Sequence, residues 1–165
     1  MVEYRERKLN RWLGYDYSQI GQYFITICTH NKEMVFGDVI NGKMVLNEYG
    51  KIAKKCWQQI PQHYLNIQID IFVVMPNHLH GIIMIDDPVG TGQCPVPTMR
   101  YGLLSKIVNS FKNVVTKQIR SRDFHFQWQR SFHDRVIRNQ WEYQKIYQYI
   151  KNNPKNWGKD RNNRG

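Results

Sequence analysis

The chain has 165 residues, a length that suits one domain able to bury roughly two thirds of its surface. It carries 24 Lys and Arg against 13 Asp and Glu, a formal net charge of +11, so a polyanionic partner is favoured, with nucleic acid first. No apolar run is long enough for a membrane helix, the start of the chain is charged rather than signal-like, and the 3 cysteines lack the spacing of a zinc site or disulfide framework. We therefore expect a cytoplasmic, nucleoid-associated protein with no membrane partner.

The first part of the chain predicts a strand, a hairpin and a helix. Residues 23–30 (YFITICTH) alternate in the manner of a strand with one buried face. Asn41-Gly42 lies between the short apolar runs of 34–47 and is the strongest local signal of a tight hairpin. Asn47 can then cap an amphipathic helix that we expect to stop at Pro61.

Two histidines stand in the second strand of a predicted antiparallel hairpin, whose runs 66–75 and 78–85 are joined at Pro76-Asn77. Because residues i and i+2 of a strand face the same side, His78 and His80 project together while Leu79 faces the core. A bare H-x-H pattern is more often a pair of half-exposed histidines than a ligand pair, so other residues must decide between the two.

A loop rich in Gly and Pro, 86–98, separates this hairpin from a second amphipathic helix. One face of that helix is apolar and the other is polar and basic. We predict that the basic face contacts DNA phosphates; an ordinary solvated face is the alternative. Its candidate residues are Lys106, Lys117 and Arg120.

The last predicted helix, 139–152, divides its tyrosines between two sides. Tyr143 and Tyr147 have the spacing of residues on the buried face of a helix. At about 100° per residue, Tyr149 lies roughly 100° from the centre of the apolar stripe, and Asn153 follows one turn later on the same side. A tyrosine beside a carboxamide, both off the core face, indicates a polar site. A tyrosine at the helix edge with its hydroxyl in water is the plain alternative.

The order of these elements predicts an α+β fold in which helices cover an antiparallel sheet, close to the ferredoxin-like βαββαβ plan. We expect a single domain over 1–165 with basic arms at 1–13 and 155–165. These arms can contact phosphates or remain flexible and solvated. Their candidate contacts are Arg5, Arg7, Lys8, Lys159 and Arg161.

Three motifs, in this order along the chain, resemble the REP-associated tyrosine transposases, a branch of the single-tyrosine HUH transposases. They are VVMPNHLHGIIMI (73–85), WQRSFHDRVIRN (128–139) and YIKNNP (149–154). The resemblance extends to GYDYSQIGQYFITICTHN (14–31) and LNEYGKIA (46–53), and so covers nearly the whole chain. It implies the ferredoxin-like fold of an HUH endonuclease or transposase.

The resemblance also implies cleavage and rejoining of single-stranded or hairpin, REP-like DNA through a 5′-phosphotyrosine, with Mg²⁺ or Mn²⁺. Matched by position, the nucleophile is Tyr149 and the metal ligands are His78, His80 and Asn153, so the family pattern and the helix phase select the same tyrosine. Two imidazoles and one carbonyl oxygen suit Mn²⁺ better than Mg²⁺. Arg138 in the second motif joins the candidate DNA contacts. Gly81 is expected to leave room for a DNA backbone.

One motif departs from the family pattern. Many relatives carry an acidic residue followed by histidine just before the I-I-R run. Here those positions hold Asp134 and Arg135, and the histidine is displaced to His133. A role of that pair in relatives is therefore not carried over to this chain.

Two alternative functions remain open from the residues. A catalytically inactive nucleic-acid binding module of the same fold would bind DNA without cleaving it. A small metal-dependent hydrolase would use His78 and His80 with a carboxylate such as Asp70 or Asp86, and would act without Tyr149. A monomer and a homodimer are both compatible with the sequence.

Overall fold

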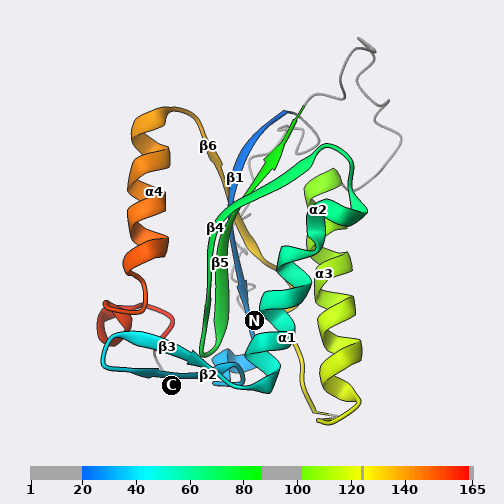
Figure 1. The fold of residues 1–165 in the computed structure, drawn as a ribbon, viewed down its shortest axis with the longest axis vertical. Helices are drawn as coiled ribbons and strands as arrows, with labels where there is room; N and C mark the ends of the chain where they lie inside the picture. The colour runs from blue at the N-terminus through cyan, green and yellow to red at the C-terminus, as the bar shows by residue number, and fades with distance from the viewer. Residues whose placement is uncertain (1–19, 87–101, 124, 164–165) are drawn as a thin grey trace, which may run out of the picture.

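The computed structural model describes residues 20–86, 102–123 and 125–163 (Figure 1). A four-stranded antiparallel sheet lies at its centre with strand order β4-β5-β1-β6. Its strands are β1 (Gly21–Cys28), β4 (Ile67–Met75), β5 (His78–Ile85) and β6 (His133–Ile137). With the helices packed on it, this sheet confirms the predicted α+β fold.

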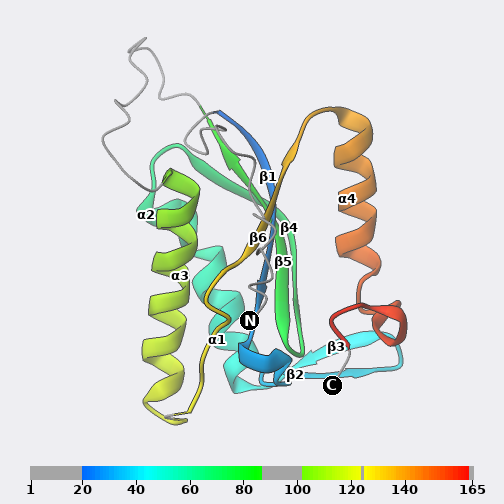
Figure 2. The same cartoon turned by 180° about the vertical axis from the view of Figure 1, so that it is seen from behind.

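Helices cover both faces of the sheet, as the two opposite views of Figures 1 and 2 show. On one face lie α1 (Glu48–Gln58) and α3 (Leu103–Arg120), and on the other lies α4 (Gln140–Asn152). The larger hydrophobic cluster joins the sheet to α1 and α3, and a smaller one, with Ile82, Ile146 and Ile150, lies under α4. Within the described residues, no helix is both long and apolar enough to cross a membrane.

The alternation of β1 assigns its residues to the two faces as predicted. Antiparallel pairing places Thr26 opposite His80 and Ile27 opposite Leu79 on β5. Leu79 is fully buried in the larger cluster, so His78 and His80 face α4. The residues of β1 that are fully buried in the larger cluster are Tyr23, Ile25 and Ile27.

The predicted hairpin is confirmed. It consists of β2 (Gly37–Ile40) and β3 (Lys43–Leu46), which pair in antiparallel register. Asn41 and Gly42 have φ angles of 52° and 70°, as a two-residue turn of this kind requires.

Helix α1 begins where the sequence predicts and ends earlier. The side chain of Asn47 accepts a hydrogen bond from the Gly50 N–H at 3.0 Å, which confirms the cap. The helix ends at Gln58, and Pro61 lies in the first turn of the short helix α2 (Ile60–His63). The expectation that Pro61 stops the helix is therefore wrong. A proline in a first turn removes no intrahelical hydrogen bond, so it starts a helix as readily as it ends one.

Strand β6 completes the sheet. It lies in the motif 128–139, for which the sequence analysis assigns no helix or strand. The chain before it is tied to β1, because the Gln129 N–H donates to the Cys28 carbonyl at 2.9 Å. The buried Lys112 of α3 donates to the Gln129 carbonyl at 2.6 Å. β6 then pairs with β1 and places Arg135 opposite Phe24.

Gly81 is required by core packing, and its expected role as an opening for DNA is wrong. It follows Leu79 on the face that packs against α1. A Cβ at this position would lie 2.6 Å from Trp57 Cζ2 and 3.1 Å from Phe72 Cβ. The missing side chain therefore makes room for the indole of Trp57.

Gly81→Ala is expected to lower the free energy of unfolding by about 1–3 kcal/mol, the usual consequence of overfilling a packed core. Urea denaturation measures this change. Gly158→Ala is the matched control, because a Cβ there meets no atom within 4 Å. Equal stability of the two variants would contradict the packing argument.

Candidate metal and nucleophile site

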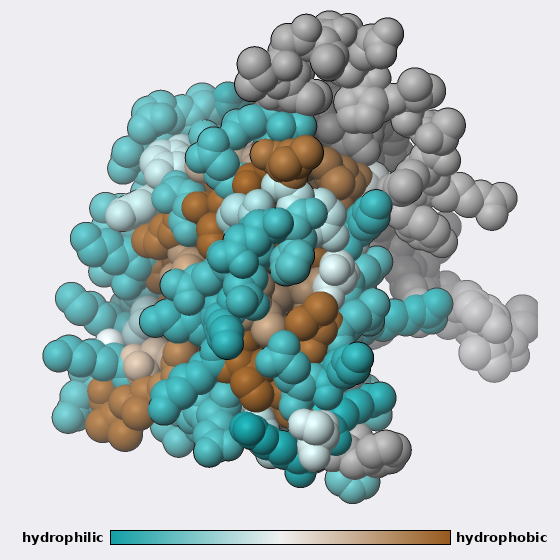
Figure 3. Space-filling model, turned by 45° about the vertical axis from the view of Figure 1, so that its right-hand side comes forward, coloured by the Kyte–Doolittle hydropathy of each residue, from teal (hydrophilic) through white to brown (hydrophobic). Residues whose placement is uncertain are grey.

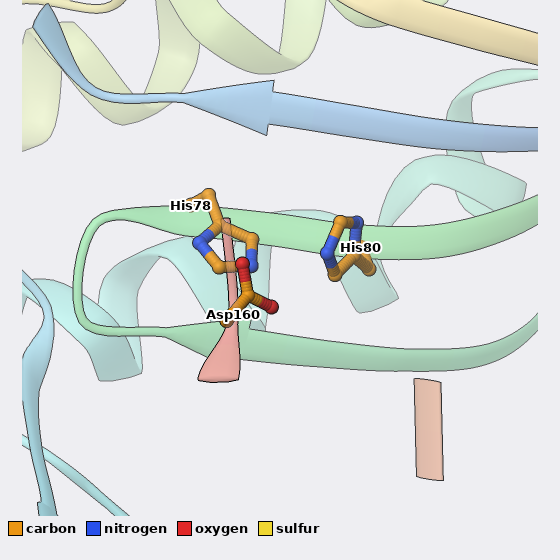
Figure 4. A group of neighbouring side chains, drawn as sticks. All are labelled: His78, His80 and Asp160. Carbon is orange, nitrogen blue, oxygen red and sulfur yellow. The ribbon is translucent and has the colours of Figure 1, made fainter. Parts of the chain in front are cut away.

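Strand β5 projects His78 and His80 toward α4 from positions just after the Pro76-Asn77 turn. Their ring centroids lie 4.4 Å apart, and the two residues are 0% and 1% exposed. Figure 4 shows the rings side by side on one strand. Because both rings are buried, the alternative of two half-exposed histidines is wrong.

Hydrogen bonds determine which nitrogen of His78 faces the site. Asn77 Nδ2 donates to the carbonyls of Lys32 at 3.0 Å and Asn162 at 2.8 Å, so Asn77 Oδ1 is an acceptor. Asn77 Oδ1 lies 2.8 Å from His78 Nδ1, which must therefore carry the proton. His78 Nε2 is left with a lone pair, and it is buried with no hydrogen-bond partner among the described residues.

Tyr149 contacts the second histidine. Thr26 Oγ1 lies 2.8 Å from His80 Nδ1, and the other ring nitrogen, Nε2, lies 3.2 Å from Tyr149 Oη. Tyr149 is 42% exposed, and its ring meets that of Phe24 edge-on at 6.0 Å. The helix phase therefore predicted the location of Tyr149 correctly. Tyr143, by contrast, donates its hydroxyl to Asp70.

Asn153 caps the C-terminal end of α4 and lies beside the histidines. It is 2% exposed, and its Oδ1 atom is buried with no hydrogen-bond partner in the described part of the chain. Its Nδ2 atom donates to Asp160 Oδ2 at 2.8 Å. The structure thus brings Tyr149, His78, His80 and Asn153 together.

Asp160 is the site residue that the sequence analysis missed. It follows the short helix η2 (Trp157–Lys159), and its carboxylate and the ligand nitrogens of His78 and His80 all lie within 4.8 Å of one another (Figure 4). It is the only acidic residue of the predicted basic arm 155–165, and that isolation is the signal that could have found it.

Burial sets the protonation of the site at neutral pH. It lowers the pKa of His78 to about 4 against the opposing charge of Asp160, and it lowers the pKa of His80 well below its ordinary value. Burial and the negative charge of Asp160 raise the pKa of Tyr149. Both imidazoles are therefore neutral, the form that binds metal, and the phenol is protonated.

The donor atoms fit a divalent cation. His78 Nε2 and Asn153 Oδ1 are buried atoms without a hydrogen-bond partner among the described residues, and such a group costs about 1–3 kcal/mol when it stays unpaired. The carboxylate of Asp160 adds a negative oxygen donor beside them. Two imidazoles, an amide oxygen and a carboxylate suit Mn²⁺, and the oxygen donors also suit Mg²⁺.

Asn77→Ala is expected to weaken Mn²⁺ binding about 10- to 100-fold, the usual effect of removing the partner that orients a histidine ligand. The reason is that Asn77 both fixes the tautomer of His78 and, through Asn162, holds the segment that carries Asp160. Calorimetric titration with Mn²⁺ measures the affinity, and circular dichroism checks that the variant is folded. The exposed Asn113 of α3 provides the control, Asn113→Ala; equal affinity in both variants would contradict this role.

A groove of about 700 Å³ opens beside Tyr149, between β1 and β6 on one side and α4 with its following segment on the other. Arg135 on its wall pairs with Glu142 of α4 at 2.8 Å. The charged residues that line the groove include two carboxylates, Asp134 and Asp160, and four cations. Those cations are Arg135, Lys145, Lys159 and Arg161.

The other predicted DNA contacts lie away from this groove or outside the described residues. Lys106, Lys117 and Arg120 are exposed on α3, across the sheet from Tyr149. Figure 3 shows the side of the molecule toward α3, where hydrophilic residues predominate around scattered hydrophobic groups. Arg138 precedes α4, and its backbone N–H donates to Glu142 at 3.0 Å. Arg5, Arg7 and Lys8 lie outside the described residues, and for all seven residues DNA contact stays a prediction.

Comparisons with known proteins place this geometry in context. No family model matches the chain. An uncharacterised protein of Haemophilus influenzae is 41% identical over 165 residues, which cover 93% of this chain and 91% of that one. The chain and the Haemophilus protein therefore belong to one family.

A solved structure of a REP-associated tyrosine transposase, bound to a REP hairpin, matches 96% of this chain and 75% of its own with a TM-score of 0.59 and 19% identity. The chain has the REP-associated tyrosine transposase fold. A proposed transposase from Deinococcus radiodurans R1 matches 87% of this chain and 97% of its own, with a TM-score of 0.50 and 16% identity. The resemblance predicted from three motifs is thus confirmed as a shared transposase fold.

Proposed function

We propose that the chain is a metal-dependent DNA transposase or endonuclease that cleaves and rejoins single-stranded or hairpin DNA through Tyr149. The observation that carries the proposal is the 3.2 Å contact between Tyr149 Oη and His80 Nε2, beside the buried donors of His78, Asn153 and Asp160. The REP hairpin held by the transposase of similar fold supports hairpin DNA as the substrate.

Tyr149 is the nucleophile in this proposal. Its Oη atom attacks the scissile phosphorus and loses its proton, while the 3′ oxygen leaves and gains one. The 5′ phosphate then remains on the enzyme as a phosphotyrosine ester, so the bond energy is kept for rejoining. Because burial and Asp160 raise the pKa of the phenol, Tyr149 stays protonated until the proton is lost during attack.

The remaining residues position the phosphate and the ion. His78, His80, Asn153 and Asp160 would hold Mg²⁺ or Mn²⁺, which when bound polarises the scissile phosphate and stabilises the departing oxygen. Thr26 and Asn77 fix the two imidazoles. The cations of the groove lie where they attract the polyanionic strand.

A denaturing-gel shift tests the proposal. The protein is incubated with end-labelled hairpin DNA from the sequence that flanks its own gene, with Mn²⁺, with Mg²⁺ or with EDTA. We expect a heat-stable protein–DNA adduct that requires the metal. Tight binding with neither adduct nor cleavage would favour the inactive binding module.

Cleavage without an adduct would favour the hydrolase. The carboxylates expected for that function are engaged elsewhere. Asp70 accepts a hydrogen bond from the Tyr143 hydroxyl, and Asp86 accepts one from the Gln68 amide. Asp160 would have to supply the carboxylate of a hydrolase.

A further inference from the structure

Helix α4 carries a stripe of four side chains at i+4 spacing that leads into the site: Trp141, Lys145, Tyr149 and Asn153. Residues four apart on a helix are neighbours on its surface. The last two members belong to the site already described. The first two, Trp141 and Lys145, have no part in holding the ion or in the attack by Tyr149.

Trp141 is unusual for its exposure. It is 65% exposed, the largest side chain among the exposed hydrophobic residues of the described chain. The ammonium of Lys145 lies 3.5 Å from the centroid of its ring. An indole with one cation against it and most of its surface in water is a platform on which a planar, electron-rich group can stack.

The stripe is continuous with the groove beside Tyr149. Lys145 and Tyr149 line one wall of the groove, and Phe24 and Arg135 line the other. Trp141 and Tyr149 are eight residues apart, a distance of about 12 Å along the helix axis, which is roughly the length of three stacked bases at 3.4 Å each. An extended ligand can therefore touch Trp141 and the Tyr149 hydroxyl at the same time.

Unpaired nucleotides fit this surface by their chemistry. Their bases stack on exposed aromatic rings, and their phosphates are attracted to Lys145, Arg135 and the other cations of the groove. A duplex exposes no base faces along its length, so it cannot use Trp141 in this way. The net charge of +11 favours a polyanion over an apolar or cationic partner.

We propose that Trp141 and Lys145 bind unpaired nucleotides of the strand that enters the groove beside Tyr149. Trp141 stacks on a base and Lys145 contacts a phosphate. The proposal rests on the proposed function, because it extends the same DNA strand from the cleaved bond along α4. It assigns the single-stranded part of the substrate to the α4 face rather than to the basic face of α3.

Fluorescence anisotropy in EDTA tests the proposal apart from cleavage. Two fluorescein-labelled hairpins are compared, one blunt and one with four unpaired nucleotides on each side. We expect the flanked hairpin to bind the wild-type protein more tightly. Trp141→Ala is expected to lose about 5- to 150-fold in affinity for the flanked hairpin and little for the blunt one. Trp141→Phe keeps a ring and is expected to restore much of the difference.

Lys145→Ala is expected to weaken binding of the flanked hairpin and to reduce the slope of log affinity against log salt by about 1. Lys51→Ala, an exposed lysine of α1 on the opposite face of the sheet, is the matched control and is expected to leave both hairpins unchanged. All three replaced side chains are exposed, so the variants retain the fold.

Equal binding of the two hairpins, or an unchanged preference in Trp141→Ala, would overturn the proposal. The outcome is independent of the chemistry. If the preference depends on Trp141 but no adduct forms in the gel assay, the proposed catalysis fails and the binding site stands. If the adduct forms and Trp141→Ala keeps the preference, the function stands and the binding site fails.

Discussion

Tyr149→Phe is expected to abolish the heat-stable protein–DNA adduct while leaving DNA binding within about two-fold of the wild type. The substitution removes one oxygen atom, and that atom is the nucleophile of the proposed reaction. The aromatic ring stays, together with its edge-on contact to Phe24 at 6.0 Å. With the hydrogen bond to His80 lost, the free energy of unfolding is expected to change by about 1 kcal/mol at most.

Tyr147→Phe provides the matched control because it removes the same atom from the same helix. Tyr147 is half-buried and its ring packs against Tyr143, away from the histidine pair. Adduct formation by Tyr147→Phe is expected to match the wild type on the same denaturing gel. Loss of the adduct in both variants would indicate damage to the helix rather than to the nucleophile.

The rival functions predict different results for the same pair. A hydrolase would continue to cleave DNA in Tyr149→Phe, and no variant would form an adduct. An adduct that persists in Tyr149→Phe would move the nucleophile to another residue and would refute the assignment of Tyr149. Quantifying bound, cleaved and cross-linked DNA in one experiment separates these outcomes.

The position of Tyr149 could be predicted because helix phase is a local property. Asn139 caps α4, its side chain accepting from the Glu142 N–H at 2.9 Å, and the geometry of the helix then fixes the direction of each later side chain. The same reasoning holds for β5, where period 2 turned His78 and His80 to one side. Local periodicity and three motifs were therefore sufficient to place Tyr149, the two histidines and Asn153 at one site.

Asp160 could not be predicted in this way because nothing periodic fixes the segment after α4. Its position depends on contacts with residues far away in the chain. The Asn77 side chain donates to the Asn162 carbonyl at 2.8 Å, and Lys32 Nζ donates to the Arg161 carbonyl at 2.9 Å. A sequence pattern carries no information about such pairings, so for this segment it predicts only a basic arm.

The basic face of α3 shows a second limit of periodicity. The pattern distinguishes the buried side of α3 from the exposed side, and both were assigned correctly. It does not tell which face of the sheet the helix covers. Whether Lys106 and Tyr149 can contact the same stretch of DNA depends on tertiary packing. That packing places α3 and α4 on opposite faces of the sheet.

The metal-free protein is expected to lose stability as the pH falls from about 6.5 to 4. Burial lowers the pKa of His78 to about 4 in the folded protein, compared with an ordinary value of 6.5. The pKa of His80 is lowered as well. In this range the unfolded chain binds protons that the folded chain excludes, so the free energy of unfolding decreases as the pH decreases. Above about pH 6.5 the rings are neutral in both states, and these histidines no longer make the stability depend on pH.

At 1.36 kcal/mol per pKa unit, His78 alone accounts for a loss of about 3 kcal/mol by pH 4, and His80 acts in the same direction. Urea denaturation at several pH values in EDTA measures the curve. His78→Gln removes the titrating ring and is expected to flatten it, whereas His63→Gln, at an exposed position of α2, is expected to leave it unchanged. A curve as steep in His78→Gln as in the wild type would show that acid unfolding begins elsewhere. It would also contradict the energetic cost assigned to protonating the buried His78 ring.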